Sequence, residues 1–524
     1  MLVIKETYMF EIKDKDLAGR IGILRTPHGR IETPYMFPVI NPRKQDVAID
    51  EIIRIGFNAL ITNAWLVKKY YGNNTSKIHE ILGHKGPIMT DSGAYQELQY
   101  GYVDVDPIEI IEYQKKIGSD IAVILDKPTP PNATLDEALS SVKTTIDRAL
   151  QAIEFIENTN QLWVLPIQGA PYIEALKLAL EKSMDPRLYN AYSIYAIGSP
   201  TKLLERYDYR TIVRIVAYVK SRIPPDKPVH LFGAGHPMII PFMVALGVDL
   251  FDSASYILYA RDERLMLSNG TVRLNELGYL PCTCPVCSKY TARELKEAPY
   301  RERVKLIALH NLYKIIEEIK RVKQAIREGR LWELLEEKAH SHPSLYEAFK
   351  ELVKYSKYLE KMDPSFKGIV HGMFLYDYYS LKRPEILRHN ERVFKRYKPR
   401  KNMIVLVPLD TRLKERLDKL YNIIGKALVG TEEYEIVFYT PFIGLVPKPL
   451  LGVYPLFQFE APLSPSKNIL SRLIKILKKF IDKAIDSNKT VVLITFRDIE
   501  WSMYIREALK SIVSKDIVLE VHDS

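Results

Sequence analysis

Short apolar, β-branched runs recur along the first half of the chain, each followed by a polar or glycine end and a helical stretch. The strands that this pattern predicts are Tyr35–Ile40, Ala59–Thr62, Ile88–Thr90, Ile121–Leu125, Trp163–Ile167, Tyr192–Ile197, Val229–Phe232 and Val248–Phe251. Amphipathic helices are predicted between them at Pro107–Gly118, Leu135–Ile156, Tyr172–Glu181 and Leu203–Arg222. Eight β/α units in about 225 residues are typical of an α/β TIM (β/α)8 barrel. A doubly wound open sheet is the alternative, but no G-x-G-x-x-G follows the early strands.

The second half of the chain follows a different pattern. Residues 336–398 are predicted to be helical and basic, and residues 399–524 to form a separate small α/β domain. Its predicted strands and helices are Met403–Val407, Tyr434–Tyr439, Thr490–Thr495, Ile517–Val521, Ser466–Ile485 and Glu500–Val513. The barrel domain, with any insertion, then occupies residues 1–335.

Unusual polar residues stand where the predicted barrel strands end. These strand ends carry Asp91, Asp126, Gln168, the Ala196-Ile197-Gly198 turn and Asp252. In a TIM barrel these ends meet at one face, which is where active groups lie. An Asp at a strand end is often only the N-cap of the next helix. Three carboxylates and an amide on one rim nevertheless favour an active site at this face of the barrel.

All three cysteines fall within six positions, as Cys282, Cys284 and Cys287. Three thiolates on one tight turn suit a tetrahedral zinc ion, with His310 on a following helix as the fourth ligand. His340 and His342 are the fallback ligands, and an iron–sulfur cluster is the rival occupant. A fully ligated site of this kind is structural. It places one zinc ion in a subdomain at about residues 260–335.

The net charge of +11 is concentrated in residues 301–400, where 23 Lys and Arg face 14 Asp and Glu. The densest part runs from Lys382 to Lys401, with nine basic and two acidic residues. Such a basic stripe is the footprint expected for nucleic acid, with a solvated helix face as the alternative. The candidate nucleic-acid-binding residues are Lys382, Arg383, Arg392, Lys395, Arg396, Lys398 and Arg400. No apolar run reaches the eighteen or so residues of a membrane span, and no signal peptide is evident, so a cytoplasmic protein is expected.

A pair of rim carboxylates suits substitution at a glycosidic carbon, with one as nucleophile and one as acid/base. The remaining Asp and Gln could read the polar edge of a base, and Tyr95 could stack on its face. A metal-dependent hydrolase is the alternative, for which His230 and His236 are conceivable ligands. The basic stripe favours chemistry on a nucleoside within RNA.

Several motifs together resemble the tRNA-guanine transglycosylase family, and specifically its archaeal-type branch. They are Thr90-Asp-Ser-Gly-Ala-Tyr-Gln96, Leu165-Pro-Ile-Gln-Gly169, Gly233-Ala-Gly-His-Pro237, Gly247-Val-Asp-Leu-Phe-Asp-Ser-Ala-Ser-Tyr256 and Pro281-Cys-Thr-Cys-Pro-Val-Cys287 with His310. The resemblance runs from about residue 10 to 335, and it implies a TIM barrel with a zinc subdomain after strand eight. It also implies exchange of a guanine in tRNA for a 7-deazaguanine, without a redox or nucleotide cofactor.

The resemblance suggests roles for individual residues. Asp252 looks like the nucleophile that attacks the ribose C1′, and Asp91 looks like the acid/base group, although the pair is firmer than the assignment. A covalent ribosyl–Asp252 intermediate is implied. Asp126 and Gln168 would bind the base edge and Tyr95 would stack. Ser92, Ala196, Ile197 and Gly198 complete the expected substrate-binding set.

The long extension resembles the archaeal branch, which acts on position 15 of the D-arm with the base preQ0, on the path to archaeosine. Relatives typically end in a PUA domain that holds tRNA, and none is recognised here. A separate PUA-containing protein is therefore a possible partner, as is a second copy of the chain in a homodimer. Two paralogous functions remain as alternatives: conversion of the inserted base, and a non-catalytic tRNA-binding subunit. The presence of both Asp91 and Asp252 argues against them.

Overall fold

The computed structural model describes residues 9–73, 76–96, 105–369, 371–410, 417–427, 433–456 and 458–519. The chain divides into two compact units. One comprises Met1–Tyr355 and Met362–Ile369, and the other comprises Ser356–Lys361 and Val370–Ser524. In the described ranges, no helix combines the length and apolar character that crossing a bilayer requires.

Eight parallel strands form the barrel of the first unit, which confirms the predicted fold. They are hydrogen-bonded in the order β4-β11-β10-β9-β8-β7-β6-β5, and a parallel bridge between Val39 and Ile61 joins the two end strands. The strands are β4 (Tyr35–Pro38), β5 (Leu60–Asn63), β6 (Ile88–Asp91), β7 (Ile121–Val123), β8 (Leu162–Ile167), β9 (Ile194–Ile197), β10 (Val229–Leu231) and β11 (Leu250–Ser253). Each predicted run overlaps one of them. Their residues are almost all buried, because helices cover the outside and side chains fill the inside.

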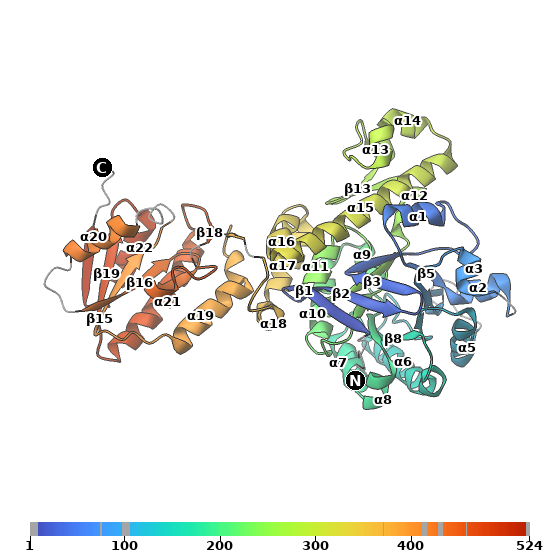
Figure 1. The fold of residues 1–524 in the computed structure, drawn as a ribbon, viewed down its shortest axis with the longest axis horizontal. Helices are drawn as coiled ribbons and strands as arrows, with labels where there is room; N and C mark the ends of the chain where they lie inside the picture. Colours follow the sequence, from blue (N-terminus) through green and yellow to red (C-terminus); the bar gives the residue numbers. More distant parts are fainter. Residues whose placement is uncertain are drawn as a thin grey trace, which may run out of the picture. The chain divides into compact units, whose positions relative to one another are not determined.

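Helices follow the strands around the barrel (Figure 1). They are α1 (Ile49–Ile55), α2 (Ala64–Tyr71), α3 (Ile78–Leu82), α5 (Pro107–Ile117), α6 (Leu135–Ile156), α7 (Ile173–Ser183), α8 (Pro186–Ala191), α9 (Thr201–Glu205), α10 (Tyr209–Lys220) and α11 (Ile240–Ala245). The longest, α6, begins at a capping box of Thr134 and Glu137, which satisfies the N–H groups of its first turn. The predicted helix Leu203–Arg222 is two helices, α9 and α10.

A three-stranded antiparallel sheet precedes the barrel, and the sequence pattern did not predict it. Its strands are β1 (Phe10–Asp16), β2 (Gly19–Thr26) and β3 (Gly29–Thr33). The β2–β3 turn reaches the buried carboxylate of Asp120, which accepts hydrogen bonds from His28 N, His28 Nδ1, His79 Nε2 and Ile88 N at 2.8–3.0 Å. Asp120 precedes β7 and Ile88 begins β6, so this contact lies at the amino-terminal end of the strands, opposite their rim.

After β11 the chain forms the predicted subdomain. It consists of α12 (Ser255–Arg261), the antiparallel hairpin β12 (Arg264–Leu267) and β13 (Gly270–Arg273), η1 (Leu274–Glu276), α13 (Pro285–Lys289), α14 (Ala292–Glu297) and α15 (Tyr300–Glu328). Helices α16 (Leu331–Ala339) and α17 (Pro343–Val353) then pack on α10 and α11 of the barrel. The predicted helical region 336–398 is thus shared between the two units.

The second unit contains a five-stranded sheet in the order β17-β16-β15-β19-β20. All of its pairs are parallel except β16–β17. Its elements are α18 (Ser356–Met362, at the boundary), β14 (Met373–Phe374), η2 (Ser380–Lys382), α19 (Pro384–Arg396), β15 (Met403–Pro408), α20 (Leu417–Ala427), β16 (Tyr434–Thr440), β17 (Gly444–Pro447), η4 (Lys448–Leu450), β18 (Phe459–Glu460), α21 (Lys467–Ile485), β19 (Thr490–Phe496), α22 (Glu500–Leu509) and β20 (Lys515–Leu519). The predicted α/β domain is confirmed as a fold class. The end of its last predicted strand, after residue 519, lies outside the described residues.

Candidate active site

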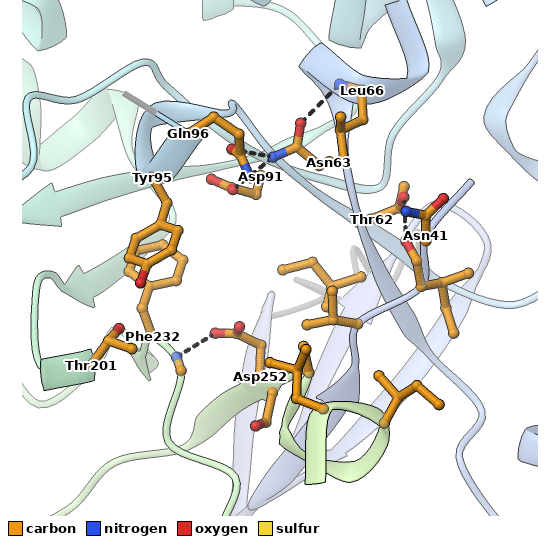
Figure 2. A pocket seen from close by; sticks show the side chains of 18 of the residues that line it. Asn41, Thr62, Asn63, Leu66, Asp91, Tyr95, Gln96, Thr201, Phe232 and Asp252 are labelled. Atoms are coloured by element: carbon orange, nitrogen blue, oxygen red, sulfur yellow. Dashed lines mark hydrogen bonds between the residues drawn. The ribbon is translucent and has the colours of Figure 1, made fainter. Parts of the chain in front are cut away.

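A pocket of about 390 Å³ opens at the carboxyl ends of the barrel strands. Its lining includes Asp91, Asp126, Gln168 and Asp252, which come from β6, the loop after β7, the loop after β8, and β11. Figure 2 shows Asp91 and Asp252 on opposite sides of an open space, with Tyr95 along one flank. The fold therefore brings the predicted carboxylates and amide to one pocket.

Asp91 lies in an environment that opposes its ionisation. Burial, and then the negative charges of Asp126 and Asp252, raise the pKa of Asp91 to about 7. Asn63 at the end of β5 donates from Nδ2 to Asp91 Oδ2 at 3.1 Å, and the same amide donates to Gln96 Oε1 at 2.8 Å. The Asn63 Oδ1 atom accepts from Leu66 N, which fixes the amide orientation. A carboxyl group with a pKa near neutrality can both donate and accept a proton under physiological conditions.

Asp252 lies in a different setting. His230 Nε2 and Gly233 N donate to Asp252 Oδ1 at 2.7 and 3.0 Å. N–H donors of this kind complement a negatively charged carboxylate and orient it. The dashed line at Asp252 in Figure 2 is the bond from Gly233. This arrangement suits a nucleophile.

Gln168 and Asp126 form one polar wall of the pocket. Gln168 Nε2 donates to Asp126 Oδ2, and Gln168 Oε1 accepts from Ser199 Oγ at 2.8 Å and from Thr129 N at 3.3 Å. Ser199 has a φ of 60°, an uncommon conformation for a residue other than glycine. A Cβ atom at Gly198 would lie 2.2 Å from Gln168 Nε2, so only glycine leaves the amide in place. The wall offers a carboxylate and an amide to the hydrogen-bonding edge of a planar ligand.

The remaining predicted substrate residues divide into two groups. Tyr95, 37% exposed, and Gly198 line the pocket. Ser92, Ala196 and Ile197 are fully buried and are not among the lining residues. Gly198 is therefore the member of the predicted backbone turn that lines the pocket.

Some residues of the site were not predicted in these roles. Asn63 ends β5, so the strand-end signal that identified Asp91 could also have identified it. Phe232 lines the pocket after β10. His230 was considered as a metal ligand, but it bonds Asp252, and His236 Nδ1 accepts from Met238 N at 3.2 Å. The contact of His230 with Asp252 joins neighbouring strands of the barrel and has no local sequence signal.

The three cysteines and His310 meet as predicted. His310 Nδ1 lies 3.2 Å from Cys287 Sγ and 3.5 Å from Cys284 Sγ, and Cys282 completes the group. His310 Nε2 donates to the Met266 carbonyl at 2.9 Å, which leaves Nδ1 as the nitrogen with a lone pair toward the sulfurs. The cluster could hold a metal ion, and its Cys3His composition suits zinc. Within the described ranges, the other comparable grouping is His28, His79 and Asp120, at the opposite end of the barrel from the pocket.

The basic stripe lies in the second unit. Arg392, Lys395, Arg396, Lys398 and Arg400 are exposed. Lys382 is half-buried, with Nζ 5.4 Å from the centre of the Tyr378 ring. Arg383 is 1% exposed and pairs with Glu385, so it is not available to a phosphate group. Exposed lysines of α21 extend the stripe, because Lys479 lies over the Phe394 ring at 4.8 Å and Lys483 donates to the Phe394 carbonyl.

Comparison with known proteins gives a consistent result. The family model described as queuine tRNA-ribosyltransferase (TGT) matches residues 14–344. A protein of Sulfolobus acidocaldarius is 46% identical over 90% of this chain and 93% of its own length, and one of Aeropyrum pernix is 44% identical over 97% and 99%. A protein of Pyrococcus furiosus is 47% identical over 74% of this chain and 65% of its own length. All three are named tRNA-guanine(15) transglycosylase.

Proposed function

The chain belongs to the tRNA-guanine transglycosylase family, and from this membership we propose that it exchanges guanine at position 15 of tRNA for the 7-deazaguanine base preQ0. The exchange is a step in archaeosine biosynthesis. The observation that carries the proposal is the pair Asp91 and Asp252 facing one pocket, the first in surroundings that favour its protonated form and the second held by N–H donors.

In the proposed first step, Asp252 forms a bond to the ribose C1′ while the bond from C1′ to guanine N9 breaks. The electron pair goes to N9, and the proton that N9 needs comes from the Asp91 carboxyl group. With its pKa raised to about 7, Asp91 can hold a proton near neutral pH and release it. In the second step the incoming base attacks C1′, its N9 proton returns to Asp91, and the Asp252 carboxylate leaves. Two displacements at one carbon retain its configuration.

We assign the polar wall of Asp126, Gln168 and Ser199 to recognition of the base edge. Tyr95 and Phe232 supply aromatic faces for a base that has left its stack. The Gly198 backbone lies where a substituent on the 7-deaza ring could be read. A site built from buried hydrogen-bonding groups discriminates strongly against bases that leave those groups unpaired.

We propose that the Cys3His cluster holds one structural zinc ion, ligated by Cys282, Cys284, Cys287 and His310 Nδ1. A closed site of this type fixes the hairpin β12–β13 and α13 against α15 through the Met266–His310 bond. The exposed basic side chains of α19 and α21 are assigned to tRNA phosphates. A homodimer and a separate PUA-containing protein remain predictions about partners.

The direct test is incorporation of labelled guanine into unmodified tRNA. Free labelled guanine can take the place of the incoming base in the second step, so the exchange of guanine for guanine reports the activity. Wild-type protein and Asp147→Ala, which alters an exposed carboxylate on α6, should incorporate the label. Asp252→Ala and Asp91→Ala should abolish incorporation or reduce it by at least about 1,000-fold. If Asp252→Ala remains active, base exchange stands but Asp252 is not the nucleophile. If wild-type protein with bound zinc incorporates no label, the proposed function is wrong. A binding or base-converting paralogue would then be favoured.

A further inference from the structure

Both N–H donors to Asp252 reach the same oxygen atom. His230 Nε2 and Gly233 N bond to Oδ1 at 2.7 and 3.0 Å. In the described part of the chain Oδ2 accepts no hydrogen bond, and Asp252 lines the pocket. The two carboxylate oxygens are thus unequal, with one anchored and the other available to a reacting carbon.

His230 is a rigid support for this anchor. It lies in the middle of β10, in register with Ala196 of β9 and Leu250 of β11, and its side chain is fully buried. Its ring lies 4.8 Å from the Phe232 ring and 6.1 Å from the Phe37 ring, measured between centres. Aromatic packing on a central barrel strand leaves the imidazole little freedom to move.

The surroundings of His230 also distinguish its two ring nitrogens. Its Nδ1 atom is buried and has no hydrogen-bond partner among the described residues. A proton on Nδ1 would therefore be a buried donor without an acceptor, which is unfavourable. This favours Nε2 as the nitrogen that carries the proton directed at Asp252. A donor in this place orients the carboxylate.

From this geometry we infer that His230 is the positioning residue of the nucleophile: as an Nε2–H donor it holds Asp252 Oδ1, with Gly233 N, and makes Oδ2 the attacking atom. This inference rests on the proposed function. Neither the resemblance nor the rim pattern gave His230 this role. Its only earlier interpretation was as a conceivable metal ligand.

The same two donors act in both chemical steps. When Oδ2 forms the bond to C1′ and guanine leaves with its electron pair, Oδ1 becomes the carbonyl oxygen of a ribosyl ester. His230 and Gly233 then hydrogen-bond that carbonyl. When the incoming base breaks the C1′–Oδ2 bond, the pair returns to the carboxylate, and charge regrows on Oδ1 beside the two donors. Preorganised donors at an oxygen that gains charge lower the barrier of such a step.

The test compares three substitutions at one position by guanine incorporation and by the covalent tRNA adduct trapped on rapid denaturation. His230→Gln places an amide Nε2 donor close to the imidazole Nε2, whereas His230→Asn ends about one bond short and His230→Leu has no donor. We expect His230→Leu and His230→Asn to lower kcat by about 100- to 1,000-fold, with KM for tRNA within about threefold. His230→Gln should stay within about tenfold of wild type. Both formation and decay of the adduct should slow in the defective variants.

The pair of amides keeps the inference falsifiable if His230→Leu fails to fold. Gln and Asn have the same polarity, so a purely structural need for a polar side chain would affect both alike. Equal activity of the two variants, or a loss that appears in KM alone, would overturn the assignment. Failure of the proposed function is separate, because it would appear as absence of incorporation by wild-type protein.

Discussion

Replacing Asp91 with Asn should make the fold more resistant to unfolding at alkaline pH while it removes activity. The pKa of Asp91 is raised from 3.8 to about 7 in the folded protein, so ionising this group is costly only in that state. Below pH 4 both folded and unfolded chains hold the proton, and the group has no effect. As pH rises from about 4 to 7, the unfolded chain loses the proton first, and wild-type stability falls. Asn cannot ionise, so the variant does not lose this stability.

The size of the effect follows from the same values. The difference between about 7 and 3.8, at about 1.36 kcal/mol for each pKa unit, gives about 4 kcal/mol above pH 7. The substitution also has a cost that does not depend on pH. The carboxylate accepts from the backbone of Ser92 and Gly93 and from Asn63, and one amide oxygen cannot accept all three. The diagnostic quantity is therefore how the difference in free energy of unfolding between Asp91→Asn and wild type changes with pH. The absolute value of that difference is not diagnostic.

The assay is denaturant unfolding of wild type and Asp91→Asn between pH 4.5 and 8.5, with Asp147→Asn as a surface control. The free energy of unfolding of Asp91→Asn relative to wild type should rise steadily up to about pH 7 and then level off. For the control it should stay flat. Parallel curves for Asp91→Asn and wild type would refute the reasoning, because they would mean that Asp91 titrates alike in the folded and unfolded chain.

Two further predictions concern metal and tRNA. Purified protein should carry about one zinc per chain, and Cys287→Ser should lose it and have a free energy of unfolding lower by several kcal/mol. Mild chelation that leaves this zinc bound should not reduce base exchange. A requirement for two metal ions at the pocket would contradict the structural role. Replacing Lys395, Arg396 and Lys398 with Ala should weaken tRNA binding and lower the salt slope by about 2, with a similar effect for Lys478, Lys479 and Lys483 of α21. A control variant with Lys143, Lys177 and Lys182 replaced by Ala should change neither tRNA affinity nor the salt slope. An unchanged salt slope in the first two triple variants would mean that their lysines and arginine belong to a solvated surface that does not bind phosphate.

The sequence predicts the parts of the fold in which a local hydrophobic pattern repeats. It does not predict the parts whose structure is determined by contacts between residues far apart in the sequence. Eight apolar runs with helical spacers indicated the barrel, since each β/α unit carries its own periodicity. The sequence pattern did not predict the N-terminal sheet β1–β3, because its outer strands β1 and β3 are only partly buried and mix charged with apolar positions. The sequence pattern also did not predict that residues 336–398 divide between the two units. Helix α17 packs on α10 of the barrel. Helix α19 belongs to the second unit, where Asn390 donates a hydrogen bond to the Ile443 carbonyl. Both depend on surfaces that are distant in sequence.

The site shows the same limit at the level of single residues. Strand-end positions identified Asp91, Asp126, Gln168 and Asp252, because the barrel topology converts a position along a strand into a place on the rim. That reasoning could not separate Ser92 and Ile197, which are buried, from Tyr95 and Gly198, which face the pocket. Likewise, counting charges could not separate buried Arg383 from exposed Arg392. Side-chain direction is set by packing, and charge density along the sequence does not encode it.

The different roles that we propose for two chemically identical carboxylates rest on their neighbours. Asp91 has like charges nearby at Asp126 and Asp252 and loses water through burial, so its surroundings retain a proton. Asp252 has two N–H groups on one oxygen, which hold that oxygen in place and leave the other one available to the pocket. The two settings are linked, because the negative charge of Asp252 is one of the causes that raise the pKa of Asp91. Under the proposed mechanism, removing a donor to Asp252 should therefore disturb the acid as well as the nucleophile, so that the pair acts as one unit.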